Sequence, residues 1–364
     1  MKEIIRKMNL SIITCVLVLV LNVTTTFAWA GLQNYSNVEN FEMSLESSDK
    51  YELKISLDGI NFYNEISDLE FKKIILNNMG FTLSEIGDSE HQINKAFGEI
   101  ALTPVTTKRI GNRLGTFVSV DDIRKDNFRY DDVLESNFVK RSYFNFDIYI
   151  AIDYVGKEVD ESYLNSYQDV YISNLDNLFT GNNKTYKLKS NYILENYFND
   201  LILTTVKVNT SSAARMSFTK YEVMERGVLS EKNIVDTIIY QGGTQTPTVQ
   251  NDVYSFGGFM NHLDNLAYLE FNDLHSDEPI SLSVFNEFYQ NRINNETGLE
   301  DAISLEQLEI PRIKLVGESD AFNSKSMIKV NVKMWLEGFD ADCFEAVSSL
   351  PLGFNLVLAN YNLH

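Results

Sequence analysis

Three carboxylates near the carboxyl end of the chain have the residue types of a metal site. Glu337, Asp340 and Asp342 lie within six residues, directly after a predicted strand. Oxygen ligands of this kind suit calcium, although the spacing differs from that of an EF-hand loop. Alternatively, Asp342 caps a short helix predicted over 341–348, because a carboxylate accepts hydrogen bonds from the free N–H groups at a helix start. Capping is the favoured interpretation, and calcium is the one cofactor that these residues suggest.

Patterns typical of catalysis are missing from the sequence. No two of the four histidines are three or four residues apart, which excludes the paired-histidine zinc motif of metalloproteases; they are His91, His262, His275 and His364. A nucleophile elbow, a phosphate-binding loop and a dinucleotide fingerprint are also missing. Adjacent carboxylates such as Asp121 and Asp122 are expected by chance among 51 acidic residues, so they do not indicate a glycosidase. We therefore predict a protein without catalytic residues.

Composition and charge exclude several classes of protein. The 364 residues are 44% hydrophobic, which is enough to bury a core and excludes a mainly disordered or collagen-like chain. The formal net charge is −20. Binding to nucleic acid or to an anionic membrane needs a basic face, so neither is expected as a general function.

The first thirty residues have the pattern of a secretory signal peptide. Basic residues precede an apolar run over 10–21, and the segment ends in Ala28-Trp29-Ala30. Cleavage is expected after Ala28 or Ala30. The run is shorter than the ~20 apolar residues that a spanning helix needs, so no permanent membrane span is predicted. The mature product is expected to be secreted, or held non-covalently at the cell surface.

The signal peptide also contains one of the two cysteines. Cys15 lies within it, so Cys343 is alone in the mature protein and no intrachain disulfide forms. A lone exported cysteine pairs between chains, acts as a nucleophile or is buried as a small hydrophobic residue. Burial is the favoured interpretation.

Alternation of apolar and polar residues predicts strands along most of the mature chain. The clearest covers 143–154 and has an inward face of Phe144, Phe146, Ile148, Ile150 and Ile152. Other predicted strands include 51–57, 282–285 and 327–336, and helices are predicted over 67–78 and 84–97. Strands with one apolar face are typical of antiparallel sheets that have one solvent-exposed face. We predict a single all-β domain over 31–364, an antiparallel jelly-roll-like sandwich with short helices and with loop insertions around 155–200 and 260–310.

Two groups of strand residues are candidates for binding. Phe41, Met43 and Leu45 alternate with polar residues in an arm over 31–50. The arm either adds as a strand to the open edge of a neighbouring molecule or is the first strand of its own sheet. Tyr143 and Tyr149 are on the predicted outer face of their strand, where they suggest a module that binds carbohydrate or a host ligand. Trp335 is also on an outer face, where it packs under a loop or contacts a partner.

Six segments spread over the chain carry a resemblance to a known family. They are Thr26–Ala30, Leu53–Phe62, Leu102–Thr106, Tyr143–Tyr149, Ala214–Phe218 and Val332–Cys343. In this order they resemble the exported Gram-positive proteins with a SipW-type signal peptide, the TasA and camelysin group. The resemblance implies a jelly-roll-like sandwich, export through a signal peptidase, and a role at the cell surface or in an extracellular matrix. Camelysins have been classed as metalloproteases, but no recognisable metal-ligand set accompanies the resemblance here.

Together these observations predict a non-enzymatic structural protein of the cell surface or extracellular matrix. It is expected to assemble with itself, into fibres of the biofilm type, or with other matrix or surface proteins. The alternatives are a surface module that binds carbohydrate or a host ligand and, less favoured, a secreted metal-dependent hydrolase.

Overall fold

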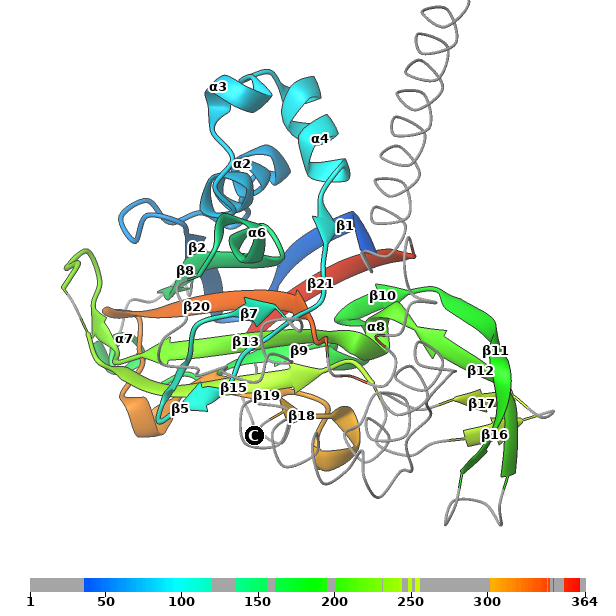
Figure 1. Cartoon of the computed structure of the whole chain (residues 1–364). Coiled ribbons are helices and arrows are strands. Elements are labelled where there is room, and N and C mark those ends of the chain that lie inside the picture. Colours follow the sequence, from blue (N-terminus) through cyan, green and yellow to red (C-terminus); the bar gives the residue numbers. More distant parts are fainter. Residues whose placement is uncertain are drawn as a thin grey trace, which may run out of the picture. The chain divides into compact units, whose positions relative to one another are not determined.

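Strands dominate the described part of the computed structural model (Figure 1). The structure describes residues 36–119, 135–155, 161–194, 201–230, 232–243, 248–250, 253–255, 302–338, 340, 343 and 350–360. All of them belong to one compact unit, Tyr35–His364. The predicted signal peptide over 1–30 and the predicted strand over 282–285 lie outside the described residues, as does the predicted helix over 341–348 apart from Cys343.

The secondary-structure elements have the following bounds. The strands are β1 (Ser36–Glu46), β2 (Tyr51–Ser56), β3 (Ala101–Leu102), β4 (Val105–Thr106), β5 (Arg109–Ile110), β6 (Arg113–Leu114), β7 (Val118–Ser119), β8 (Tyr143–Tyr154), β9 (Val170–Ser173), β10 (Phe179–Gly181), β11 (Asn183–Leu194), β12 (Leu201–Asn209), β13 (Ala214–Tyr221), β14 (Met224–Glu225), β15 (Ile234–Gln241), β16 (Thr248–Gln250), β17 (Val253–Ser255), β18 (Ala302–Ile303), β19 (Ile313–Val316), β20 (Ser326–Leu336) and β21 (Pro351–Asn360). The α-helices are α2 (Asp68–Asn78), α3 (Leu83–Ile86), α4 (Glu90–Gly98), α6 (Asn137–Lys140), α7 (Glu161–Leu164) and α8 (Thr210–Ala213), and the 3₁₀ turns are η2 (Leu175–Asn177), η5 (Leu305–Gln307) and η6 (Glu318–Asp320).

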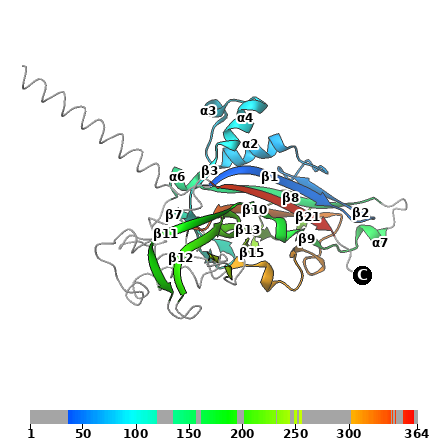
Figure 2. The ribbon, with the colours of Figure 1, turned by 90° about the vertical axis from the view of Figure 1, so that its right-hand side faces the viewer.

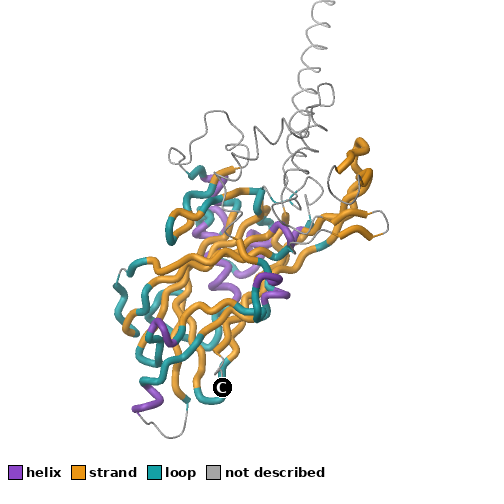
Figure 3. Tube along the Cα trace, turned by 90° about the horizontal axis from the view of Figure 1, so that it is seen from below, coloured by secondary structure: helices purple, strands orange, loops and turns teal. Residues whose placement is uncertain are grey.

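Two large sheets organise the described strands. The seven-stranded sheet has the order β18-β15-β13-β20-β8-β2, with β14 also paired to β20, and the six-stranded sheet has the order β19-β9-β21-β1-β3, with β10 also paired to β21 (Figure 2). A four-stranded sheet has the order β11-β12-β17-β16. The predicted all-β sandwich with short helices is confirmed, as the tube in Figure 3 illustrates, whereas the jelly-roll arrangement stays a prediction.

The sheets are mixed, which differs from the wholly antiparallel arrangement expected from the sequence. Most neighbouring strands are antiparallel, but β1 runs parallel to β21 along almost its whole length. A parallel pair needs a long crossover connection, and here nearly the whole domain separates its first strand from its last. Alternation within each strand predicts burial but carries no information on which distant strand lies beside it.

The hydrophobic core lies between the two large sheets. The five residues predicted to face inward from β8 are at most 1% exposed. Phe41 of β1 packs edge-on against Phe146 of β8, with ring centroids 5.8 Å apart. Phe354 of β21 contacts Phe144 of β8, with centroids 5.8 Å apart. Aromatic rings from both sheets therefore interdigitate, as in a sandwich.

Helices α2 and α4 lie beside β1 and β8 (Figure 1). The predicted helix over 67–78 is confirmed, with Ser67 as the N-cap that accepts a hydrogen bond from the Glu70 N–H group. The predicted helix over 84–97 is divided into α3 and α4, because Gly87 adopts a positive φ of 92° and Ser89 caps a new helix. Among the described helices, none is long and apolar enough to cross a membrane.

A second hydrophobic cluster covers part of the outer face of the seven-stranded sheet. Phe117 stacks on Tyr143 at a centroid distance of 4.0 Å and contacts Trp335 edge-on at 5.2 Å. Tyr143 and Trp335, both expected on the wet side, are therefore buried. The ammonium group of Lys333 lies over the Phe117 ring, and burial lowers the pKa of Lys333. The segment over 101–119 accounts for the burial of Tyr143 and Trp335, since it adds a third layer on this face.

Candidate functional site

The first strand of the domain has different neighbours on its two edges. On one edge, β1 pairs with β21 in parallel, from Asn37 to Glu46. On the other edge it pairs with the two-residue β3, through Ser36 and Asn37 alone. The register with β21 shifts between Val38 and Asn40, where a bulge ends the region that β3 covers. Most of the second edge is therefore left without a strand of the described residues.

The register with β21 fixes the direction of the β1 backbone groups. The Asn355 N–H group donates to the Leu178 carbonyl oxygen at 2.9 Å, so the backbone groups of Asn355 point away from β1. In a parallel pair, the residue opposite such a position directs its own N–H and C=O groups toward the partner strand. Glu42 is opposite Asn355, and its backbone groups consequently point to β21.

The alternate residues of β1 direct their N–H and C=O groups away from β21; they are Phe41, Met43 and Leu45. No strand or backbone hydrogen bond from the described residues takes up these groups. We call this side of β1 the open edge. Such an edge is a ready template for hydrogen bonding to another extended chain.

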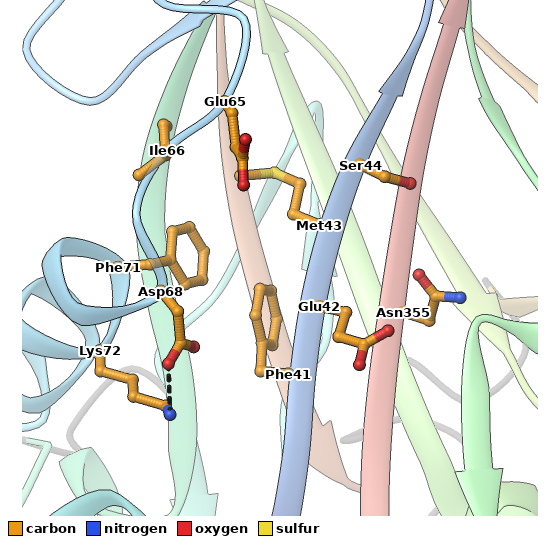
Figure 4. Close-up of a pocket in the computed structure, with 10 residues that line it drawn as sticks. All are labelled: Phe41, Glu42, Met43, Ser44, Glu65, Ile66, Asp68, Phe71, Lys72 and Asn355. Atoms are coloured by element: carbon orange, nitrogen blue, oxygen red, sulfur yellow. Dashed lines mark hydrogen bonds and ion pairs between the residues drawn. The ribbon is translucent and has the colours of Figure 1, made fainter. Parts of the chain in front are cut away.

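A groove runs along the open edge (Figure 4). It has a volume of about 500 Å³ and is continued by a second hollow of about 240 Å³, with which it shares Met43, Ser44, Glu65 and Ile66. In Figure 4, Phe41 and Met43 extend from β1 toward the opposite wall, which Glu65, Ile66 and the first turns of α2 form. We call the two hollows together the edge groove.

The wall opposite β1 is firmly attached to the core. Phe71 of α2 stacks on Phe41 at a centroid distance of 4.5 Å, and Ile75 on the same helix is fully buried. An ion pair between Lys72 and Asp68, with 2.6 Å between Nζ and Oδ2, joins successive turns at the groove rim. The edge groove is therefore bounded by a strand and a helix that share one hydrophobic contact.

The predicted assembly residues and the edge groove coincide. Phe41 is buried, and Met43 and Leu45 are partly buried against the core. The structure thus places the arm as the first strand of its own sheet, which is the second of the two alternatives stated above. Its role in assembly stays a prediction, and now concerns the edge that β1 leaves open.

Two of the three predicted metal-ligating residues are described by the structure, and both interact with other side chains of the protein. Asp340 forms a fully buried ion pair with Arg215, and the Glu337 carboxylate accepts a hydrogen bond from the Trp335 indole N–H at 3.1 Å. The Arg215 guanidinium supplies Asp340 with the positive charge that a calcium ion would bring. Asp342 lies outside the described residues, so calcium at this place stays a prediction. No group of three or more potential metal-ligating side chains occurs among the residues that the structure describes.

The remaining candidates for chemistry are dispersed. Cys343 is buried, at 8% exposed, as the favoured interpretation expected. His91 is exposed on α4, while His262, His275 and His364 lie outside the described residues.

Sequence reasoning missed two features of the candidate site. The opposite wall comes from residues 64–72, which the sequence marks as a helix start but not as a neighbour of β1. The partner of Asp340 is 125 residues away, at Arg215, and no spacing rule connects them. Comparisons with family models, with curated proteins and with solved structures give no match to this chain.

Proposed function

We propose that this chain is a non-enzymatic structural protein, exported to the cell surface or extracellular matrix, which assembles with further copies of itself through the open edge of β1. The observation that carries the proposal is the edge groove beside Phe41, Met43 and Leu45. Export rests on the signal-peptide pattern over 1–30 and on the resemblance to the TasA and camelysin group.

An extended segment of a second copy is the occupant that fits the edge groove. Monomeric proteins usually protect a sheet edge with bulges, inward charges or a covering helix. In β1 the register shift precedes Asn40, so the stretch from Phe41 to Leu45 is regular. An added strand there would satisfy three N–H and three C=O groups and place alternate side chains against Ile66 and Phe71. Strand addition thus accounts for both the regular edge and the hollow beside it.

The charge of the chain adds a condition to assembly. At a formal net charge of −20, copies repel one another at low ionic strength. Screening shortens this repulsion to within about 10 Å at 0.1 M salt. Assembly by strand addition is therefore expected to strengthen as salt is added, because backbone hydrogen bonds are little affected by screening.

Light scattering and negative-stain microscopy of purified residues 31–364, over a series of protein and salt concentrations, test this proposal. Concentration-dependent rods or fibres are expected. Met43→Pro removes an N–H group of the open edge and is expected to abolish them, while Met43→Ala, which keeps that group, retains them. Thermal melting of both variants checks that the fold is intact. A protein that stays monomeric under all conditions, or equal assembly of the two variants, would overturn the proposal.

A further inference from the structure

A pocket opens on the outer face of the seven-stranded sheet, separate from the edge groove. It has a volume of about 490 Å³, and its walls are formed by Tyr149 of β8, Tyr221 of β13 and the loop residues Leu229, Ser230 and Lys232. Lys329 of β20 and Met224 of β14 also line it. This volume is within the ~300–1,000 Å³ that is typical of small-molecule sites. We call it the tyrosine pocket.

Two tyrosine rings flank an ammonium group in the tyrosine pocket. Lys329 Nζ lies 5.0 Å from the ring centroid of Tyr221 and 5.9 Å from that of Tyr149. Asp147 of the neighbouring strand β8 forms an ion pair with this ammonium group, with 2.8 Å between Nζ and Oδ2. Neither phenol hydroxyl forms a hydrogen bond with a described residue. The pocket therefore combines apolar ring surface, two available hydroxyl groups and a positioned cation.

The lining of the tyrosine pocket has the opposite charge from the chain as a whole. Among the described residues that line it, two are lysines, Lys329 and Lys232, and none has a carboxylate, although the chain has 20 more acidic than basic residues. No ion pair to Lys232 occurs among the described residues. Complementarity favours an anionic ligand whose charge meets Lys232 and whose body lies against the apolar walls.

The walls of the tyrosine pocket are held in place by the turn after β2. Gly59 has a φ of 74°, and a Cβ atom there would lie 2.6 Å from Leu229 Cδ2 and 3.0 Å from Tyr149 Cε1. Glycine therefore lets the turn pack directly against the loop wall and the tyrosine wall at once. Walls that are fixed before the ligand arrives lose little conformational entropy on binding.

We propose that the tyrosine pocket binds an acidic sugar, such as a uronic acid residue of a polysaccharide. The carboxylate of the sugar pairs with Lys232 and Lys329, the sugar C–H groups contact Tyr149 and Tyr221, and the phenol hydroxyls form hydrogen bonds with its hydroxyl groups. A simple anion would use the lysines but leave the aromatic and apolar walls without contacts. This inference does not depend on strand addition at β1.

Isothermal titration calorimetry with tetragalacturonate tests the inference, since its fully methyl-esterified form has the same sugar framework without charge. Binding of the acid form is expected, at least tenfold tighter than binding of the ester and weakened by salt. Inorganic phosphate, a plain anion, is expected to compete only at concentrations at least tenfold higher. No binding of the acid form, equal binding of acid and ester, or equally strong binding of phosphate would each overturn the inference.

Two charge-reversal variants identify the location of the binding site. Lys232→Glu is expected to weaken binding of tetragalacturonate at least tenfold. Lys140→Glu, at an exposed lysine on α6 outside the pocket, introduces the same charge change and is expected to leave binding within twofold. Equal losses in both variants would place the interaction elsewhere and overturn the assignment. Thermal melting of each variant checks that loss of binding is not loss of fold.

Discussion

The rings of Phe41 in β1 and Phe71 in α2 are stacked, with centroids 4.5 Å apart. One contact thus joins the strand that has an open edge to the helix that walls the groove beside it. Both rings are at most 5% exposed, and Phe41 also contacts Phe146 of the facing sheet. The edge groove is consequently a feature of the core packing and not of a loosely attached arm.

Truncation of Phe71 tests this attachment. Phe71→Ala is expected to lower the free energy of unfolding by about 3–5 kcal/mol, because it removes a buried ring and leaves a cavity beside Phe41. Urea denaturation measures the change. Phe138→Ala is the matched control, since that ring is 48% exposed and its loss is expected to cost below about 1 kcal/mol. Similar costs for the two variants would contradict the proposed anchoring of α2.

The central strand β8 gives a second comparison between identical residue types. Ile148 is fully buried, whereas Ile60 is 63% exposed. Ile148→Ala is expected to destabilise the protein by about 2–5 kcal/mol. Ile60→Ala is expected to destabilise it by less than about 0.5 kcal/mol, because the side chain is exposed. The midpoints of chemical unfolding measure both. An unchanged midpoint for Ile148→Ala would refute the inward orientation of that face.

Local sequence patterns predict the individual strands and helices better than they predict which strands pair with one another. The period-2 alternation of β8 and β20 identifies both strands and their buried faces, because burial of one face is a local property of each strand. The caps at Ser67 and the turn at Gly59 are local as well. The parallel pairing of β1 with β21 is not local, since over 300 residues separate Phe41 from its partner Phe354. The open edge follows from that pairing, so local sequence patterns do not predict it.

The same limit applies to the candidate binding residues. Alternation places Tyr149 on an outer face, and this is where it lines the tyrosine pocket. Tyr143, six residues earlier and on the same face, is covered by Phe117. Alternation assigns both tyrosines to one face but does not reveal that the segment over 101–119 covers only one of them.

The buried ion pair between Arg215 and Asp340 supports a prediction about charge. Asp340→Asn is expected to destabilise the protein by about 3–5 kcal/mol, since it leaves the guanidinium buried without its counter-charge. Asp153→Asn breaks the partly exposed pair with Arg226 and is expected to cost at most about 1 kcal/mol. Urea denaturation of both variants measures the difference.

The double replacement of this pair makes the prediction more specific. Arg215→Met combined with Asp340→Leu is expected to be more stable than Asp340→Asn alone, because no uncompensated charge remains in the interior. The coupling energy between the two sites follows from a double-mutant cycle. Additive effects of the two single replacements would contradict a direct interaction.

The turn at Asp58 is expected to make stability depend on pH. Hydrogen bonds from the backbone N–H groups of Asn61 and Ile60, and then from the Ser56 hydroxyl, hold the pKa of Asp58 well below its usual range. The folded pKa is thus lower than the unfolded value of about 3.9. The ionised carboxylate therefore stabilises the fold fully above about pH 5, and this contribution is lost as the pH falls below about 4 toward the folded pKa.

Asp58→Asn isolates this contribution from that of the other carboxylates. An asparagine retains a side-chain oxygen for the two backbone N–H groups but carries no charge, so the variant is expected to be less stable than the wild type at pH 7. The difference in stability should narrow steadily between pH 4 and pH 2, because only the wild type loses a charge at position 58. Melting temperatures of both proteins across this range measure it. Melting curves that remain separated by a constant interval would show that Asp58 titrates alike in the folded and unfolded states.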